Sequence, residues 1–530
     1  MGKSNKKNRE LFNKYLNGIR TADWMIYLYL FAVFGIYTWI TDDAYFNITM
    51  TRYKFISTAT YAFIVLFVIT IAIEKMIEYA LLDEIISINR IVDKKKFWKR
   101  PDFWAMAFLM ANIFAYIVSI DKATSMMGSN GRYMGCLTYV FLCVMFVFIA
   151  NRLKPDMLII SIFGITSAFA YIVAIFQHAG IDFMSYKDRI AKSNYHIFTS
   201  TFGNINVFAS FICISMPMFI AIYIFYNKNI RKIFMALLII LGGMSTIISN
   251  SDSVYLGVVA ALCVIFLLSF YNSKTKAFFE TLIMFATGNI FVVIMRNLFE
   301  CEYDKKRGGV AEILDEPKIA IGLLIGVCLL YAIVLLLDKK FGQRLVNINR
   351  KKIIIYMIVF VGVLFIIFIV AGILLKISIF EFNYEWGTYR GFIWTKCIEI
   401  FGDAPVVNKI FGYGNETLRL LTHTHCYEEM IEVTGKSYDN AHNELIQYLV
   451  TTGIVGVVSY IGMFVSSVSY MIKNANKEPI VLACAASACG YFVQGLININ
   501  QPITTPLFFV VLAVGVGCAR YKERLLLQEN

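Results

Sequence analysis

The chain has 530 residues, of which 58% are hydrophobic, 15% aromatic and only 16% charged, and its formal net charge is +13. Soluble globular chains carry about 25% charged residues and fewer apolar ones. This composition therefore excludes a soluble secreted enzyme, a disordered scaffold and an ordinary cytosolic protein of two domains. Because the basic residues stand in short runs between apolar stretches, they indicate membrane topology rather than binding to nucleic acid.

A helix needs about 20 mostly apolar residues to cross a bilayer, and windows of that size predict an all-α polytopic integral membrane protein with about 14 transmembrane helices. The expected spans are 24–40, 55–73, 103–120, 133–150, 157–177, 207–226, 233–248, 254–270, 278–295, 319–337, 353–375, 454–472, 479–496 and 504–519. We divide the chain into three parts: an N-terminal transmembrane bundle over 1–375, a large extracytoplasmic loop with an interfacial helix over 376–440, and C-terminal transmembrane helices over 441–530.

Charge asymmetry predicts the orientation of the chain. Most of the 49 lysines and arginines lie on the side of the N-terminus, many of them in short connectors such as 152–154 and 228–232. Short loops rich in these residues stay in the cytoplasm. Both termini are therefore expected to be cytoplasmic, in an inner or cytoplasmic membrane. No small-residue cleavage site follows the first span, so no cleavable signal peptide is expected.

Two long segments then lie outside the membrane, 178–206 and 376–440. The second is too rich in aromatic residues for disorder, so we expect it to be folded and to rest on the outer leaflet. Three cysteines also lie outside the predicted spans. A disulfide between Cys301 and Cys426 stays open, because an odd number of outside cysteines argues against a disulfide framework.

The histidines at 423 and 425, with Cys426 and two glutamates after it, superficially suggest a metal site. Their spacing matches none of the familiar zinc patterns, so we expect no metal there. A Walker A sequence is absent, which argues against ATP hydrolysis, and no Asp-x-Asp occurs. No cofactor is expected. The two halves of the chain also show no duplicated loop pattern, which argues against a transporter built from repeats.

Asp439 and Asn440 are natural N-caps, so we expect a helix to begin there with His442 in its first turn. The helix dipole disfavours a protonated imidazole at that place, and a neutral histidine can take a proton from a hydroxyl. The helix continues with a polar stripe at helical spacing, formed by Glu444, Gln447, Tyr448, Thr451 and Thr452. Polar residues at membrane depth face the bundle interior or a water-filled cavity. The alternative is a histidine that only caps or solvates the helix end.

Arg390 opens a stretch with an apolar face, which predicts an amphipathic helix in the membrane interface. Arginine suits bidentate capture of phosphate oxygens, although position alone favours an arginine that merely anchors the helix. The segment 178–206 adds Lys187, Arg189 and Lys192, which would bind either a lipid pyrophosphate or ordinary lipid headgroups.

Several of these elements resemble the signature of the O-antigen ligase and O-antigen polymerase family. They are residues 440–447 and 452–456, Arg390 with Trp394, residues 403–405 and 410–414, and, more weakly, residues 203–206. The resemblance implies the C-type membrane glycosyltransferase fold. It also implies an enzyme that works on the outer face with an undecaprenyl-pyrophosphate-linked glycan as donor, without metal or ATP.

The resemblance further implies roles for individual residues. His442 corresponds to the catalytic histidine of the family and Arg390 to an arginine that engages the pyrophosphate. A substrate groove would be lined by Asn443, Glu444, Gln447, Tyr448 and Asn204. The family's ligases often carry Ser-Arg-Gly where this chain has Asp252. That departure weakens the ligase interpretation and leaves Lys187, Arg189 and Lys192 as substitutes.

We therefore predict a polymerase of a cell-surface polysaccharide, which transfers the lipid-linked glycan to a sugar hydroxyl of another lipid-linked repeat unit. The nearest alternative is a ligase that passes the glycan to a lipid, wall polymer or protein. A second alternative is a flippase for lipid-linked oligosaccharides. The expected partners are the undecaprenyl-pyrophosphate-linked oligosaccharide and membrane lipid, with a flippase and a chain-length regulator as candidates and no nucleic acid.

Overall fold

A computed structural model describes residues 21–82, 97–129, 131–299, 309–346, 349–374, 381–475 and 478–529. Over these residues the chain is almost entirely helical. One two-stranded antiparallel sheet pairs β1 (Phe198–Thr199) with β2 (Gly203–Asn204), with Phe198 opposite Asn204. The prediction of an all-α polytopic membrane protein is confirmed.

Each predicted span coincides with one helix. These helices are α2 (Thr21–Phe31) with η1 (Ala32–Ile36), α3 (Ile48–Leu82), α4 (Pro101–Ile117), α6 (Cys136–Arg152), α7 (Met157–His178), α8 (Ile205–Phe225), α9 (Asn229–Ile248), α10 (Asp252–Tyr271), α11 (Thr275–Leu298), α13 (Pro317–Val346), α14 (Arg350–Leu374), α19 (Glu444–Asn474), α20 (Pro479–Gly495) and α21 (Thr505–Glu529). Within the described residues, nine helices are long and apolar enough to cross a membrane, and four apolar helices are shorter.

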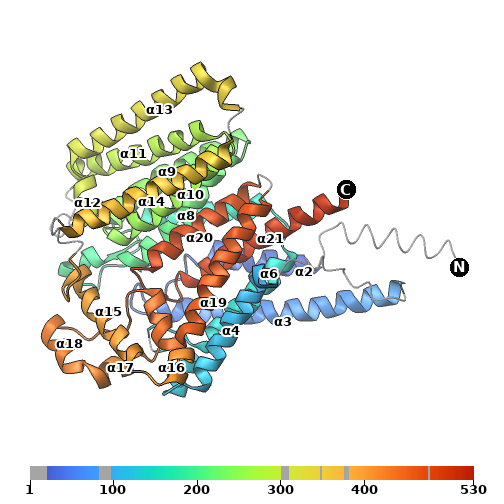
Figure 1. Cartoon of the computed structure of the whole chain (residues 1–530), viewed down its shortest axis with the longest axis vertical. Coiled ribbons are helices and arrows are strands. Elements are labelled where there is room, and N and C mark those ends of the chain that lie inside the picture. The colour runs from blue at the N-terminus through green and yellow to red at the C-terminus, as the bar shows by residue number, and fades with distance from the viewer. Residues whose placement is uncertain are drawn as a thin grey trace.

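The remaining helices are short or lie between the spans. They are η2 (Phe97–Lys99), α5 (Lys122–Met127), η3 (Lys192–Ile197), α12 (Gly309–Leu314), α15 (Trp386–Gly402), α16 (Val406–Phe411), α17 (Leu418–His425) and α18 (Tyr427–Thr434). The last four belong to residues 381–443, which we call the loop domain. Its helices gather at one end of the molecule, away from the C-terminal end of α21 (Figure 1). The prediction that this loop is folded is thus confirmed for its described residues.

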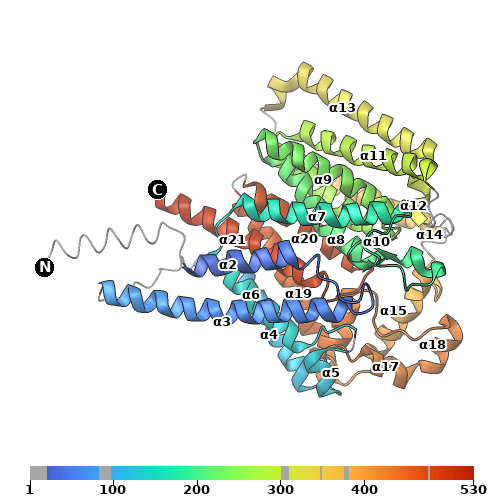
Figure 2. The ribbon, with the colours of Figure 1, turned by 180° about the vertical axis from the view of Figure 1, so that it is seen from behind.

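The core of the bundle is built around α8. In the apolar part of this helix, 94% of the residues are buried. It packs against α9, α10 and α20. Toward one edge, α9, α11 and α13 follow one another, and the outermost of them, α13, is only 6% buried in its apolar window (Figures 1 and 2). An apolar helix with so little protein contact is suited to face lipid.

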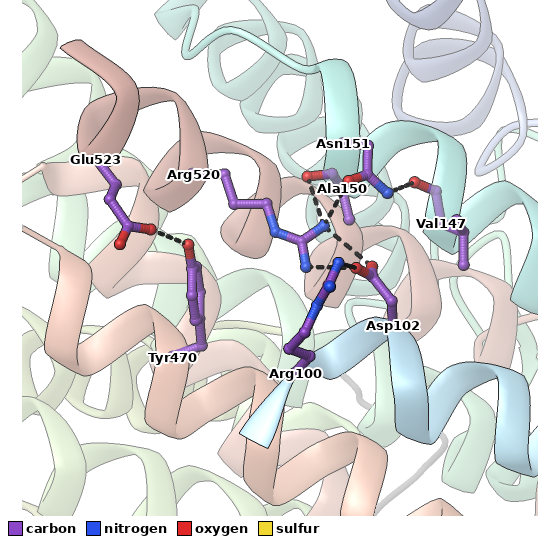
Figure 3. Close-up of polar contacts among 8 residues, drawn as sticks. All are labelled: Arg100, Asp102, Val147, Ala150, Asn151, Tyr470, Arg520 and Glu523. Atoms are coloured by element: carbon purple, nitrogen blue, oxygen red, sulfur yellow. Dashed lines mark hydrogen bonds and ion pairs between the residues drawn. The ribbon is translucent and has the colours of Figure 1, made fainter. Parts of the chain in front are cut away.

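One end of the bundle is closed by paired charges, and we call it the charge-paired end. The guanidinium of Arg520 on α21 contacts both carboxylate oxygens of Asp102 on α4, at 3.0 and 2.8 Å, and Asn151 on α6 at 3.0 Å (Figure 3). Nearby, Arg152 forms ion pairs with Asp23 on α2 and with Glu74 on α3. These contacts tie together the starts of α2 and α4 and the ends of α6 and α21.

The loop domain has a small core of its own. Ile393, Cys397 and Ile400 of α15 pack against Leu418 and Leu421 of α17, together with Ala441 and Val450. The apolar face on which the prediction of an interfacial helix rested is therefore covered by protein. Burial of these side chains fixes the position of α15 relative to the start of α19.

Candidate active site

The segment that leads into α19 differs from the sequence prediction. The helix begins at Glu444, and Asn443 is its N-cap, because its side-chain oxygen accepts hydrogen bonds from the N–H groups of Leu445 at 2.9 Å and Ile446 at 3.1 Å. The prediction that His442 lies in the first helical turn is wrong. The physical reason is a competing local turn, in which Asn440 Oδ1 accepts from the N–H of His442 at 2.9 Å. Asn readily makes such turns with the backbone two residues on.

The backbone around His442 is held from two sides. The N–H of Ala441 donates to Gln447 Oε1 on α19 at 3.0 Å, and its carbonyl accepts from Trp394 Nε1 on α15 at 2.8 Å. His442 itself has φ +50°, a left-handed conformation that costs a non-glycine residue on the order of 1 kcal/mol. Such strain persists only where surrounding contacts determine it, so α15 and α19 together position the imidazole.

The imidazole of His442 is neutral at pH 7. Burial, together with the charges of Arg390 and Arg132, lowers the pKa of His442 to about 4, against the opposing effect of Asp439. A neutral histidine at this place was predicted from the helix dipole, but the cause in the structure is burial beside two cations. The ring also lies edge-on to that of Tyr438, with centroids 5.9 Å apart. A half-buried neutral imidazole can accept a proton from a hydroxyl group that approaches it.

Arg390 follows a kink in α15, where Gly387, Thr388 and Tyr389 have φ of 61°, 62° and 68°. Burial lowers the pKa of Arg390, whereas Asp252 and Tyr438 raise it. The guanidinium nevertheless stays charged, as arginine does in proteins. Within the described residues it makes no hydrogen bond or ion pair, so its donors remain available to a ligand.

A second arginine at the site was not singled out by sequence analysis. Arg132, in the segment between α5 and α6, forms a bidentate pair with Asp439, at 2.6 Å from Nη2 to Oδ1 and 3.2 Å from Nε to Oδ2. Burial acts to raise the pKa of Asp439, but Arg132 holds it below the usual range. In the sequence, the only feature that could have pointed to Arg132 was its position as one of few basic residues in a loop predicted to lie outside.

The same segment reaches a buried carboxyl group. Ser129 Oγ donates to Glu416 Oε2 at 3.1 Å. Burial raises the pKa of Glu416 to about 7, although Arg132 acts in the opposite direction. Glu416 therefore changes its charge near neutral pH, and it too was missed by sequence analysis.

The predicted groove residues are all buried or nearly so. Glu444 faces the bundle, where its carboxylate accepts from the hydroxyls of Tyr460 at 2.6 Å and Tyr491 at 2.9 Å. The hydroxyl of Tyr448 lies 3.1 Å from that of Tyr139 on α6. The polar stripe on α19 thus points into the bundle interior, as predicted, and Gln447 is the member that contacts the His442 turn.

The residues predicted on the segment 178–206 have other surroundings. Arg189 pairs with Asp43 on the segment before α3, and the ammonium of buried Lys187 lies 5.5 Å from the ring centroid of Tyr195. Lys192 is exposed at the start of η3, and Asn204 is the N-cap of α8. Arg189 therefore takes its charge partner from the segment before α3 and not from the His442 turn.

Two glycine-containing parts of the family signature meet each other. The N–H groups of Tyr413 and Gly414 donate to the carbonyls of Val450 at 3.0 Å and Thr451 at 2.9 Å. These carbonyls are free for this purpose because α19 is kinked at Gly453, whose φ is +69°. A Cβ at Gly453 would lie 2.3 Å from the carbonyl oxygen of Ile410. This contact fastens the loop domain to α19 just below the His442 turn.

The open question of a Cys301–Cys426 disulfide is not tested by the structure. Cys426 is a free thiol, and Cys301 lies outside the described residues. Among the residues that the structure describes, no group of three or more His, Cys, Asp and Glu side chains could hold a metal ion.

Comparison with known proteins identifies one segment. Residues 318–461 match the family model described as O-antigen ligase, and no curated protein matches the chain. The match includes Arg390, Trp394, His442 and the two glycine segments that meet at the kink of α19. It excludes residues 203–206. The match supports, over residues 318–461, the resemblance to the O-antigen ligase family that the signature residues indicated.

Proposed function

We propose that the protein is a polymerase of a cell-surface polysaccharide of the O-antigen, capsule or exopolysaccharide type. It transfers an undecaprenyl-pyrophosphate-linked glycan to a sugar hydroxyl of another lipid-linked repeat unit. The match to the O-antigen ligase family supports a glycosyltransferase-like enzyme that acts on lipid-linked oligosaccharides. The observation that carries the proposal is the combination of a half-buried neutral His442 and a nearby Arg390 without an ion-pair partner among the described residues.

The chemistry follows from these two groups. The oxygen of the acceptor hydroxyl forms a bond to the anomeric carbon of the donor glycan while the bond from that carbon to the pyrophosphate oxygen breaks. The hydroxyl proton passes to the imidazole of His442. The pyrophosphate lipid leaves with the electron pair, and Arg390 stabilises its negative charge. No metal or other cofactor is needed to balance this step.

Asp252 supports a polymerase over a ligase. It begins α10 and lies close enough to Arg390 to raise the pKa of that guanidinium. The family's ligases often have an arginine in this region, so this chain has a carboxylate where a ligase would add a second cation. Arg132 is the other cation near His442, and it is paired with Asp439. We assign the phosphate contact to Arg390 alone and regard Lys187, Arg189 and Lys192 as secondary.

The ligase remains the second candidate, because the matching family model is described as O-antigen ligase. In both cases we propose that the termini are cytoplasmic and that the site faces the outside of the cytoplasmic membrane. A flippase that delivers the donor and a chain-length regulator are the proposed protein partners.

The test compares purified wild type with His442→Ala and Arg390→Ala, using the cell's own lipid-linked oligosaccharide and a glycan gel. His425→Ala and Arg419→Ala are matched controls, since both residues are also in the loop domain, on α17. A ladder of lengths from wild type and both controls, lost in the two site variants, is the expected result.

Other outcomes would contradict the proposal. A single product that appears only when a lipid, wall polymer or protein acceptor is added would favour a ligase. A wild type that leaves the oligosaccharide chemically unchanged but moves it across the bilayer of a vesicle would favour a flippase. Full activity in the His442 variant would reject the assigned base.

A further inference from the structure

Two buried side-chain amides are attached to the His442 turn. Asn440 is 1% exposed and Gln447 is 2% exposed. The oxygen of Asn440 accepts from the N–H of His442, and that of Gln447 accepts from the N–H of Ala441. The two amides therefore hold the N–H groups of consecutive residues, one from the turn itself and one from α19.

The nitrogens of these amides are the unusual feature. Asn440 Nδ2 and Gln447 Nε2 are buried and have no hydrogen-bond partner among the described residues. The orientation of each amide is fixed, because only its oxygen can accept from a backbone N–H. Turning either amide over would break the bond that holds the turn. The turn therefore carries two orphan N–H₂ groups, next to the residue proposed as base.

Such an arrangement is expensive in a protein interior. A buried donor without a partner costs on the order of 1–3 kcal/mol. Other buried polar atoms of the described residues also lack partners, but these two meet at one turn beside His442. Both amides could have been replaced by side chains with an acceptor and no second donor. Two unsatisfied donors at one turn indicate groups that are satisfied by a ligand.

We propose that the amide nitrogens of Asn440 and Gln447 donate hydrogen bonds to oxygen atoms of the acceptor sugar. This inference rests on the proposed function, in which His442 takes the proton of the attacking hydroxyl. Neutral amides suit hydroxyl and ether oxygens, whereas the charged pyrophosphate is the natural ligand of Arg390. The contacts go to oxygens next to the attacking hydroxyl, because a donor on the attacking oxygen itself would weaken its nucleophilicity.

The burial of the two amide nitrogens affects how a sugar can bind to them. Because they are not exposed, the sugar reaches them only by displacing the groups that cover them. The hydrogen bonds formed by two orphan donors offset the free energy of that displacement. A sugar without oxygens in the right places gains nothing from the displacement, so the pair also selects the acceptor.

The test removes each amide nitrogen and keeps an acceptor for each backbone N–H. In Gln447→Glu the oxygen for Ala441 remains, and in Asn440→Ser a hydroxyl can still accept from His442. Ser437→Asp, at an exposed position of the same segment, controls for the added charge of Gln447→Glu. The acceptor probe is the same oligosaccharide on a short alkyl chain, which lacks pyrophosphate and so cannot act as donor.

We expect the KM for this acceptor probe to rise about tenfold in Asn440→Ser and in Gln447→Glu, in line with loss of one hydrogen bond. The KM for the lipid-linked donor should stay within twofold of wild type. The melting temperature of Asn440→Ser should not fall, because the variant removes an unsatisfied donor. Ser437→Asp should leave both constants unchanged.

Two results would overturn this assignment. One is an unchanged acceptor KM in both variants of a protein whose wild type is active, which would leave the proposed function intact. The other is an equal rise of donor and acceptor KM with a lower melting temperature, which would show that the amides only support the fold. Inactivity of wild type with every acceptor would instead refute the proposed function, and this inference with it.

Discussion

The charge-paired end and the His442 turn lie at opposite ends of α4. They differ in whether their polar side chains have partners within the protein. At the charge-paired end, Arg520 contacts Asp102 and Asn151, and Arg152 contacts Asp23 and Glu74. At the other end, the segment after α4 meets the loop domain, where the N–H of Ile120 donates to the carbonyl of Tyr413. There Arg390 has no ion-pair partner among the described residues, and two amide nitrogens are unsatisfied.

This difference separates structural charges from charges kept for a ligand. A paired and hydrogen-bonded charge holds helices together, and its removal leaves a partner uncompensated. An unpaired cation adds no stabilising contact, and an unsatisfied buried donor lowers stability. Loss of either should therefore weaken substrate binding or turnover without destabilising the protein. The same residue type, arginine, therefore has opposite predicted phenotypes at the two ends.

Arg390→Ala should show the largest effect. We expect kcat/KM to fall about a thousandfold, equivalent to roughly 4 kcal/mol of lost stabilisation of the leaving group. The melting temperature in detergent should stay within a few degrees of wild type, since no described partner is lost. The measurement is single-turnover transfer together with thermal aggregation. If Arg390→Ala were instead destabilised and kept normal turnover per folded molecule, Arg390 would be a structural residue like Arg520, and the two ends would not differ.

Arg520→Ala should show the reverse pattern. Removing this guanidinium leaves Asp102 with only the longer contact from Arg100, at 3.3 Å. We expect the free energy of unfolding to fall by about 2 kcal/mol, while turnover per folded molecule is kept. The double variant with Asp102→Asn should recover part of the loss, because the carboxylate that has lost its main partner is gone. Urea titration in detergent measures both. Equal stability of the single variant and wild type would contradict the prediction.

Trp394→Phe tests how the protein positions His442, at the end of the molecule that holds the candidate active site. The ring keeps most of its packing but loses the hydrogen bond to the carbonyl of Ala441. We expect about 1 kcal/mol of lost positioning, seen as a roughly fivefold lower kcat with little change in KM. A change in KM alone would show that Trp394 contacts substrate instead of positioning His442.

The smallest effect on turnover is expected from a change of pH between 6 and 8. The pKa of His442 is lowered to about 4, so the imidazole is already in its base form and turnover should be flat with respect to this group. Activity should fall only as pH drops toward 4. Because the folded-state pKa is below the ordinary value near 6.5, the stability linked to His442 is also present above that value and lost as pH falls through 4.

Arg132→Gln tests the cause of this low pKa. Loss of the cation, with Asp439 left beside the ring, should move the acidic limb of the pH profile to higher pH. A rate profile from pH 4 to 8 for wild type and variant checks this. An unmoved limb would mean that burial and Arg390, without Arg132, set the pKa of His442.

Some features of the site could be predicted because they depend on local pattern. Hydropathy indicates every membrane helix, since a bilayer leaves no alternative to about 20 apolar residues in one helix. His442 and Arg390 stand in a signature that can be recognised without coordinates. The N-cap could not be chosen in the same way. Asn440 and Asn443 are equally good caps, and only the local turn made by Asn440 assigns the role to Asn443.

The sequence by itself determined that this protein is an all-helical membrane protein with the O-antigen ligase signature around His442. It determined this because hydropathy and short motifs are properties of neighbouring residues. Only the tertiary structure decided which groups surround the histidine. Arg132 reaches Asp439 across 307 residues of chain, and Trp394 reaches Ala441 from another helix. Such contacts depend on how the helices pack, and packing is a property of the whole chain.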